Sequence, residues 1–379
     1  MLKKTRSRGS IRRFAVVTVA ASVAIVVAGG DARGADRELA PSFSSAVKSA
    51  ALVDTVVMPE VDAAALVAEA EALDQVPGGG AARFAHPIAV TTSMTNAGTW
   101  DALSDGSELW RVRITSPGAL SLNLGIGRLA LPAGGRLWIY GHGGELVHGP
   151  YTVSDLDAAG ELWSPLVLGD ELTVEVHLPA AGRPFAAVEI ARVNHGFRFF
   201  GEPGRGAVDK QGACNIDVVC PEGDPWRDQI RSVGWYTLAG IETCTGTLLN
   251  NTSQDLTPYF LTANHCDVNV ALARTMVVYW NYESPNCGDL SGGMLSDTTR
   301  RATWLADWEQ SDTTLVRLDE QPNSAYNVYY SGWDATGVAP QGSVGIHHPN
   351  TDEKAISFNT DPLYDYDVQG THWEVGEWE

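Results

Sequence analysis

The sequence predicts a protein built mainly of β-strands. Between residues 84 and 200, short apolar runs rich in β-branched and aromatic residues are separated by Pro and Gly, which is the pattern of an antiparallel sandwich. The last part of the chain has further short apolar strands and holds all five cysteines, Cys214, Cys220, Cys244, Cys266 and Cys287. Hydrophobic residues make up 44% of the chain and charged residues 19%, which excludes a disordered protein or a coiled coil. A length of 379 residues favours two or three domains.

Residues 1–35 have the pattern of an export signal. A basic start that includes Lys3 and Arg13 precedes an uncharged apolar run from Phe14 to Ala28, followed by small residues. A run of about 15 residues is short for a membrane span. We therefore expect cleavage between residues 30 and 35 and a secreted, extracellular protein with no membrane anchor. The Arg12-Arg13 pair leaves twin-arginine export open.

Two further segments are expected before the cysteine-containing part. Residues 36–83 are Ala-rich, and residues 61–73 suit a short helix that ends before Pro77. Residues 84–200 form the predicted sandwich, with strands at 109–114, 120–124, 136–140, 171–178 and 187–193. A Gly- and Pro-containing stretch begins at Gly201, so we assign residues 201–210 to a linker and residues 211–379 to the last domain.

The charge balance excludes one class of partner. The formal net charge is −20, whereas a nucleic-acid-binding protein needs a basic face to neutralise phosphates. A negative field attracts cationic substrates, although it also simply keeps secreted proteins soluble. Lysine is scarce, and only five occur: Lys3, Lys4, Lys48, Lys210 and Lys354.

Two motifs in the last domain point to nucleophilic hydrolysis. YFLTANHC, at residues 259–266, carries His265 from an apolar strand into a turn, and SDTTLVRL places Asp312 at the start of an alternating strand. An imidazole that accepts a proton from a serine needs a carboxylate to orient it. A bridge between Cys244 and Cys266 would close a loop of about 22 residues, stabilise the fold by roughly 3 kcal/mol and fix the histidine.

The segment from Cys214 to Lys354 resembles the lysyl endopeptidases, a family of secreted bacterial chymotrypsin-like serine proteases. The motifs that carry the resemblance occur in family order: CNIDVVCPEGD, WRDQIRSVG, CTGTLLNN, YFLTANHC, VVYWNY, SDTTLVRL and GIHHPNTDEKAIS. The resemblance implies a double β-barrel, acyl-enzyme chemistry without a cofactor, His265 as general base and Asp312 as the orienting carboxylate. It also implies disulfides Cys244–Cys266 and Cys220–Cys287, and a third from Cys214 to a cysteine nearer the family's C-terminus.

The same resemblance predicts that the nucleophile serine is not present in this chain. The family's Gly-x-Ser-Gly turn and its acidic lysine pocket would follow Glu379, and five cysteines are an odd number for a secreted domain. We therefore expect a truncated, inactive chain with an incomplete second barrel. Ser291, in GDLSGG, precedes Asp312 against the family order, and Ser343, in GSVG, matches a non-catalytic strand entry, so neither is expected to be the nucleophile.

Other candidate residues have simpler interpretations. His347 and His348 are adjacent, so on a strand they point to opposite faces and do not readily bind one metal ion. Trp226, Trp280 and Trp304 are expected in the core or at its rim rather than as substrate platforms.

Residues 36–210 fit a propeptide that ends at Lys210. A cut between Lys210 and Gln211 is one that a lysine-specific enzyme could make on its own precursor, although Arg205 offers a competing site. Beyond Lys210 only Lys354 remains as a self-cleavage site. The sequence thus predicts a monomeric zymogen of a serine endopeptidase. Its partners are its own propeptide and protein or peptide substrates cut after basic residues, with lysine preferred to arginine.

One alternative comes from another functional class. The chain could be a secreted pseudoprotease or a binding module in which the sandwich does the work, and the missing serine favours this. The presence of His265, Asp312 and a pairable Cys244 and Cys266 argues against it.

Overall fold

The computed structural model describes residues 38–74, 80–144, 146–198, 215–289, 291–365, 370–376 and 378. The expected export signal, the Lys210–Gln211 bond, Cys214 and Glu379 lie outside these residues. Asp36–Glu379 belongs to one compact unit. None of the helices in the described part of the chain has the length and apolar character needed to span a bilayer.

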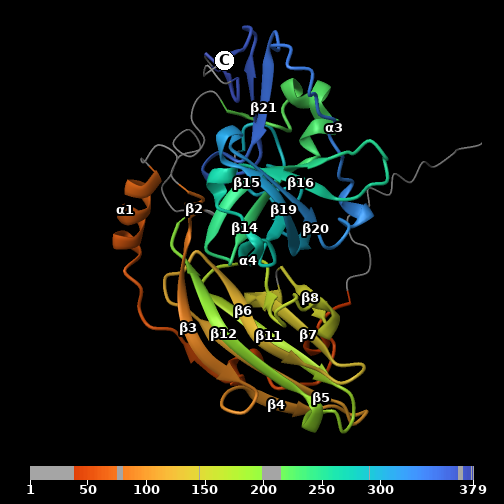
Figure 1. Cartoon of the computed structure of the whole chain (residues 1–379). Coiled ribbons are helices and arrows are strands. Elements are labelled where there is room, and N and C mark those ends of the chain that lie inside the picture. The colour runs from red at the N-terminus through yellow and green to blue at the C-terminus, as the bar shows by residue number, and fades with distance from the viewer. Residues whose placement is uncertain are drawn as a thin grey trace, which may run out of the picture. The chain divides into compact units, whose positions relative to one another are not determined.

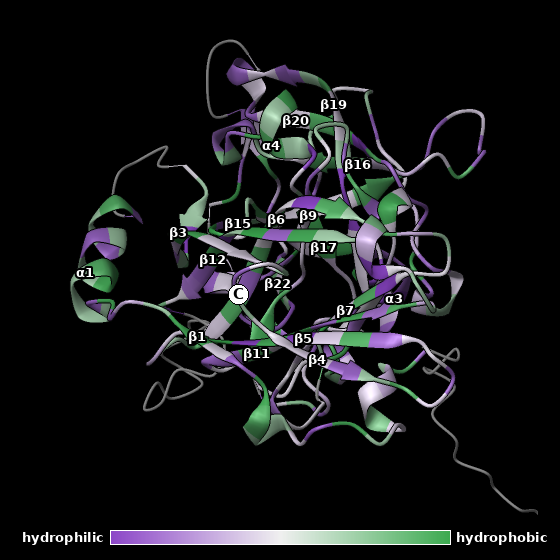
Figure 2. Cartoon of the chain, turned by 90° about the horizontal axis from the view of Figure 1, so that it is seen from below, coloured by the Kyte–Doolittle hydropathy of each residue, from purple (hydrophilic) through white to green (hydrophobic). Residues whose placement is uncertain are grey.

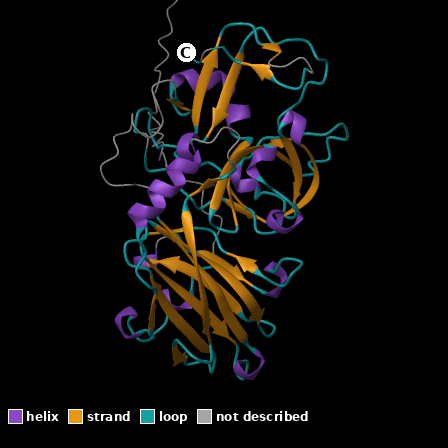
Figure 3. Ribbon diagram, turned by 60° about the vertical axis from the view of Figure 1, so that its left-hand side comes forward, coloured by secondary structure: helices purple, strands orange, loops and turns teal. Residues whose placement is uncertain are grey.

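The N-terminal half is a β-sandwich (Figures 1 and 3). One sheet has the order β1-β5-β11-β7-β8 with β4 on β5, and contains β1 (Thr55–Val57), β4 (Thr99–Ala102), β5 (Glu108–Thr115), β7 (Arg136–Gly141), β8 (His148–Tyr151) and β11 (Glu171–Leu178). The other has the order β10-β6-β12-β3 with β9 on β6, and contains β3 (Ala85–Ser93), β6 (Ser121–Ala130), β9 (Leu162–Trp163), β10 (Val167–Leu168) and β12 (Ala187–Gly196). Side chains from both sheets share one apolar core. The sandwich expected from the sequence is therefore present.

Alternation along the strands explains how each face is filled. Val174 on β11 pairs with Val112 on β5, and both lie in the core between the sheets. The neighbouring residue, Glu175, points the other way and is also buried. Tyr140 Oη donates to Glu175 Oε2 at 2.7 Å, and the backbone N–H of Ser42 donates to Glu175 Oε1 at 2.9 Å. The outer face of this sheet is thus covered by the chain segment around residue 42.

Residues 38–83 join both halves of the protein rather than forming a unit of their own. The helix expected at residues 61–73 is α1 (Ala63–Asp74), which buries only Ala70 and mixes apolar and polar residues around its surface (Figure 2). β1 pairs in parallel with β5 of the sandwich. β2 (Ala82–Arg83) pairs instead with β15 of the C-terminal half.

The C-terminal half begins with a curled eight-stranded sheet of order β18-β17-β14-β15-β16-β20-β19, with β2 on β15. Its strands are β14 (Val233–Leu238), β15 (Glu242–Leu249), β16 (Tyr259–Thr262), β17 (Val277–Tyr279), β18 (Thr298–Arg300), β19 (Ala302–Trp308) and β20 (Thr313–Leu318). Tyr236, Leu248, Phe260 and Val316 fill its inside. Trp280 is fully buried in this core and Trp304 packs against it, as the sequence predicted.

A smaller sheet follows, with order β13-β22-β21. It contains β13 (Ile216–Asp217), β21 (Ser343–His347) and β22 (Ala355–Asn359), and β23 (Tyr364–Asp365) pairs separately with β24 (Trp373–Glu374). Val218, Ile230 and Ile356 form its apolar cluster, with Trp226 at the rim. The predicted all-β fold class is confirmed.

The remaining elements are short helical turns. They are η1 (Pro41–Phe43), η2 (Ala50–Leu52), η3 (His142–Gly144), η4 (Val153–Asp155), η5 (Arg183–Phe185), η6 (Pro221–Trp226), α3 (Arg227–Ile230), η7 (Asn264–Cys266), α4 (Val270–Ala273), η8 (Glu309–Ser311), η9 (Ser324–Tyr326) and η10 (Pro349–Thr351). Two of them, η7 and η8, position the candidate active site.

The two halves meet at the turn between β14 and β15. Asn194 Nδ2 donates to the carbonyl oxygen of Ala239, and Asn123 Nδ2 donates to that of Gly240, both at 2.9 Å. Gly240 has a φ of +66°, and a Cβ there would lie 1.8 Å from Asn123 Oδ1. The close approach and the left-handed backbone both require glycine.

Candidate active site

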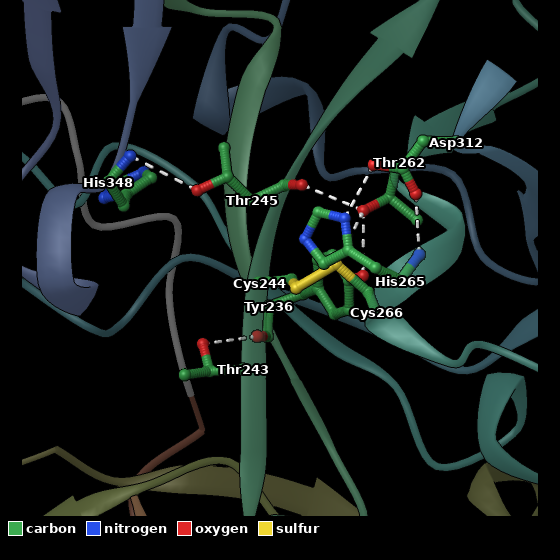
Figure 4. Close-up of a disulfide and its surroundings, with 9 residues drawn as sticks. All are labelled: Tyr236, Thr243, Cys244, Thr245, Thr262, His265, Cys266, Asp312 and His348. Carbon is green, nitrogen blue, oxygen red and sulfur yellow. Dashed lines mark hydrogen bonds and ion pairs between the residues drawn. A yellow bond between two sulfur atoms is a disulfide. The ribbon is translucent and has the colours of Figure 1, made fainter. Parts of the chain in front are cut away.

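His265 lies where β16 passes into η7. β16 delivers it because Phe260, in the same strand, is anchored in the core. The next residue, Cys266, is bonded to Cys244 on the neighbouring strand β15 (Figure 4). The turn then ends at Asp267, whose φ of +56° is left-handed. The histidine is thus held by a strand on one side and a disulfide on the other.

Asp312 reaches the same place from the adjacent strand. β20 pairs with β16, with Thr314 opposite Thr262, so the residue before β20 comes next to the residues after β16. Asp312 ends η8 with a φ of +47°, and its carbonyl oxygen accepts a hydrogen bond from the backbone N–H of Asn264 at 3.1 Å. Short-chain Asp tolerates this conformation better than most residues.

The carboxylate of Asp312 makes two hydrogen bonds to His265, one to the ring and one to the backbone. Asp312 Oδ2 lies 2.6 Å from His265 Nδ1, and Oδ1 accepts the backbone N–H of the same histidine at 2.8 Å. An ionised carboxylate can only accept, so Nδ1 carries the proton and Nε2 is left as the acceptor. The side chains are 43% and 36% exposed, which leaves the imidazole open to a substrate. The structure therefore brings together the two residues that the sequence selected.

A buried hydrogen-bond chain lies beneath this pair (Figure 4). Thr262 Oγ1 donates to the carbonyl oxygen of Thr245 at 2.9 Å and lies 2.8 Å from the hydroxyl oxygen of Tyr236. Burial raises the pKa of Tyr236, so the phenol stays protonated and donates to Thr262. The chain ties the end of β16 to β14 and β15. Sequence reasoning did not single out Thr262, although it lies within the YFLTANHC motif.

A residue of the N-terminal half, Gly80, packs against the end of η7, the turn that holds His265. Gly80 is so close that a Cβ there would lie 3.1 Å from Asp267 Oδ2 and 3.6 Å from the carbonyl oxygen of His265. Next along the chain, β2 pairs with Glu242 and Thr243, directly before Cys244. Burial and the negative charge of Asp267 raise the pKa of Glu242. Sequence reasoning missed this contact, because no local pattern marks a two-residue strand that pairs with a distant segment.

One group of side chains in the described residues resembles a metal site. Cys244, His265 and Cys266 have their ligand atoms within 4.8 Å of one another. Both sulfur atoms belong to a disulfide, so neither is a thiolate that could bind zinc.

His347 and His348 differ strongly in environment. His348 is buried, donates from Nδ1 to the carbonyl oxygen of Asp352 at 2.9 Å and stacks on Tyr282. Burial, and then the positive charge of Lys354, lower the pKa of His348 well below its usual value. Burial also lowers the pKa of His347.

The two candidate serines lie elsewhere. Ser291 is in an exposed loop, where its Oγ donates to the carbonyl oxygen of Asp289 at 3.1 Å. Ser343 begins β21 and accepts a hydrogen bond from Asn359. Within the described ranges, the side chain of His265 hydrogen-bonds only to Asp312.

The disulfides follow the pattern that the family resemblance implied. Cys220–Cys287 and Cys244–Cys266 are both formed. Cys214 lies outside the described residues.

Comparison with known proteins agrees with this arrangement. The family model "Lysyl endopeptidase, C-terminal domain" matches residues 208–379, and "Lysyl endopeptidase N-terminal domain" matches residues 58–197. The chain is 33% identical over 278 residues to the lysyl endopeptidase of Pseudomonas aeruginosa, an alignment that covers 68% of this chain and 59% of that protein. The curled sheet that carries His265 and Asp312 fits the chymotrypsin-like all-β fold expected of such proteins. The two halves of the chain match the two domains of one family, and the chain belongs to the lysyl endopeptidases.

Proposed function

We propose that the chain is the precursor of a secreted serine endopeptidase that cleaves peptide bonds after basic residues, with lysine preferred. The observation that carries this proposal is the carboxylate of Asp312, which binds both the imidazole and the backbone N–H of His265. The relative from Pseudomonas aeruginosa is named for lysyl specificity, which supports lysine as the preferred residue.

The geometry suits acyl transfer with His265 as the base. Nε2 accepts the proton of a serine hydroxyl as its oxygen attacks the scissile carbonyl, and the imidazolium then donates that proton to the leaving amine. Asp312 keeps Nδ1 protonated and stabilises the imidazolium. Backbone amides beside the serine would stabilise the oxyanion, and water would then release the acyl group.

We further propose that the 379-residue chain does not hydrolyse peptides by itself. Its support is that no described serine reaches the imidazole of His265. The same observation favours the pseudoprotease alternative for the 379-residue chain. The match of the sandwich to an N-terminal domain of the same family argues against an unrelated binding module.

The test compares the 379-residue chain with the product of the gene read past codon 379. Both are assayed on peptides with Lys or Arg before a fluorogenic leaving group. We expect no turnover by the 379-residue chain, and turnover by the longer product that prefers Lys and is lost in His265→Ala. Turnover by the 379-residue chain would contradict its proposed inactivity. Turnover by the longer product that survives His265→Ala, or that prefers Arg, would contradict the proposed mechanism or specificity.

The domain roles are proposed on the same basis. Residues 1–35 are the export signal, residues 36–83 and 84–200 the pro-segment, residues 201–210 the processing linker and residues 211–379 the protease domain of an extracellular monomer. Processing falls between Lys210 and Gln211. N-terminal sequencing of the mature form should give Gln211, and a start at Gly206 would instead favour cleavage after Arg205.

A further inference from the structure

The described lysines lie in opposite environments. Outside residues 1–35 the sequence has only Lys48, Lys210 and Lys354, and the structure describes the first and the last. Because the proposed function is cleavage after lysine, the surroundings of each lysine decide where the chain can cut itself or be cut by another copy.

Lys354 is inaccessible in the folded protein. Its side chain is 1% exposed, and Nζ donates to the carbonyl oxygen of Ile230 at 2.9 Å and to Glu283 Oε1 at 3.1 Å. Its backbone N–H donates to Tyr282, and its carbonyl oxygen accepts from Val218. A protease needs an extended peptide with the lysine side chain in its pocket, so cleavage here requires opening of the core beside β22.

Lys48 lies in a segment without regular structure. Residues 46–49 belong to no helix or strand, and residues 46–48 make none of the backbone–backbone hydrogen bonds seen in the described chain. The side chain is 48% exposed. Its Nζ donates to the carbonyl oxygen of Trp100 at 2.7 Å.

A clasp of two charged side chains, Asp101 and Arg111, holds the backbone of Lys48. Its N–H donates to Asp101 Oδ1 at 3.3 Å, and its carbonyl oxygen accepts from Arg111 Nη2 at 2.7 Å. Arg111 also donates to Asp101 Oδ2 at 2.8 Å. Burial opposes ionisation of Asp101, but the hydrogen bonds from Arg111 and Lys48 outweigh it and lower its pKa. Freeing Lys48 therefore breaks a few polar contacts, whereas freeing Lys354 breaks core packing.

The segment around Lys48 also borders a cavity of about 440 Å³. The cavity lies between residues of the 42–53 segment and Arg111, Arg113 and Tyr140 of the sheet. Segments with incomplete packing and few backbone hydrogen bonds open at low free-energy cost.

We infer that the Lys48–Ser49 peptide bond is a second processing site of this chain, within the N-terminal sandwich, and that Lys354 is shielded from the same activity. The inference rests on the proposed preference for lysine. Hydrolysis consumes one water molecule: the C–N bond breaks, Lys48 gains a carboxylate and Ser49 gains an ammonium group.

Cleavage there weakens the sandwich. Residues ahead of Lys48 cover the outer face of its sheet, where Ala40 packs on Trp138 and Tyr140. The carbonyl oxygen of Glu38 accepts from Trp138 Nε1 at 3.0 Å, and Ser42 binds the buried Glu175. Once the segment is released, Glu175 loses that backbone donor.

The experiment treats the folded 379-residue chain with a purified lysine-specific endopeptidase and identifies the new N-termini over time. We expect Ser49 and Gln211 to appear, and cleavage after Lys354 only when urea is added. Absence of Ser49 after Lys210 is fully cut, or cleavage after Lys354 as fast as after Lys48 without urea, would overturn the inference.

Variants then test the clasp. Asp101→Asn should speed cleavage after Lys48 by about tenfold, because the rate follows the population of the open segment. Glu189→Gln is the matched control, since Glu189 forms an exposed ion pair with Arg128 elsewhere on the sandwich. Lys48→Arg should abolish this cut while leaving the one after Lys210. Equal rates in Asp101→Asn and Glu189→Gln would show that the clasp does not limit access.

The added protease separates this inference from the proposed function. If the added protease cuts after Lys48 but the longer gene product shows no preference for Lys peptides, the accessibility of Lys48 stands and the proposed lysine preference fails. If neither cuts there, the site itself is wrong. The melting temperature of the sandwich should be lower after release of residues 38–48 than before. An unchanged melting temperature would contradict the claim that cleavage after Lys48 weakens the sandwich.

Discussion

At the residue scale, the carboxylate of Asp312 accepts hydrogen bonds from both the ring and the backbone N–H of His265. It therefore fixes the tautomer of the ring and the position of the histidine. In Asp312→Asn an amide N–H can donate to Nδ1, which would move the imidazole proton to Nε2. We expect ¹⁵N NMR to show protonated Nδ1 in the parent chain and protonated Nε2 in the variant. The proposed endopeptidase activity should fall on the order of 10⁴-fold in this variant.

A control for this substitution lies at the other end of β20. Asp319 accepts a hydrogen bond from Thr303 and makes none to His265, so Asp319→Asn should leave the ring tautomer unchanged. A protonated Nδ1 in Asp312→Asn would mean that the carboxylate does not set the tautomer.

The lowered pKa of His348 makes the stability of the fold depend on pH. Burial and the charge of Lys354 lower its pKa, the hydrogen bond to Asp352 opposes this, and the unfolded value is about 6.5. Protonation therefore favours the unfolded chain, so this contribution to stability is complete above pH 6.5 and is lost as the pH falls below it. His195 and His347 act in the same direction, and Glu242, whose pKa is raised, in the opposite one.

Denaturant unfolding between pH 7.5 and pH 5 measures the effect. The unfolding free energy should fall by up to about 1.4 kcal/mol per pH unit for the proton on His348. His348→Gln keeps a donor for the Asp352 carbonyl but does not titrate, so its slope should be smaller. Equal slopes in the two proteins would contradict the assignment.

At the scale of elements, the two disulfides should contribute differently to stability and to the order of the active site. Cys244–Cys266 spans 22 residues and Cys220–Cys287 spans 67. Chain entropy predicts that replacing each pair by Ala costs about 3 and about 4 kcal/mol of unfolding free energy, respectively. Removing only Cys244–Cys266 should also broaden the His265 imidazole NMR signals, because that bridge adjoins the histidine. Identical broadening in both variants would show that the bridge does not hold the ring.

Strands with a local signature could be predicted from the sequence. Four of the five runs expected in the sandwich fall within β5, β7, β11 and β12, and the run 120–124 overlaps β6 from residue 121. Alternation and Pro or Gly boundaries are local properties of the sequence. His265 and Asp312 were found because each lies in a distinctive motif. β1, β2 and the contact at Gly80 could not be predicted, since they depend on partners far along the chain.

At the scale of the whole molecule, Gly240 lies where the sandwich meets the eight-stranded sheet. Gly240→Ala adds left-handed strain and a clash with Asn123, whereas Gly118→Ala adds a similar strain at φ +80° with nothing within 4 Å. We expect Gly240→Ala to lose about 1–3 kcal/mol more stability than Gly118→Ala. Denaturant unfolding monitored by intrinsic fluorescence measures the difference, and equal losses would contradict the close approach.

The predicted domain order rests on the change in cysteine use and linker composition near residue 200. How the halves meet was not, because Asn123, Asn194 and Leu166 look like ordinary strand and loop residues. Leu166 donates its backbone N–H to the hydroxyl oxygen of Tyr279, a contact that only the folded chain defines.

The pairing of β2 with β15 has a consequence for synthesis. The ribosome makes Ala82 and Arg83 long before Glu242 and Thr243, so the sandwich can form while the later residues are still being added. When β15 leaves the ribosome, β2, which pairs with its edge, has already been made. A C-terminal half made without residues 80–83 would leave the edge of β15 beside Cys244 unpaired and would be prone to aggregate through it.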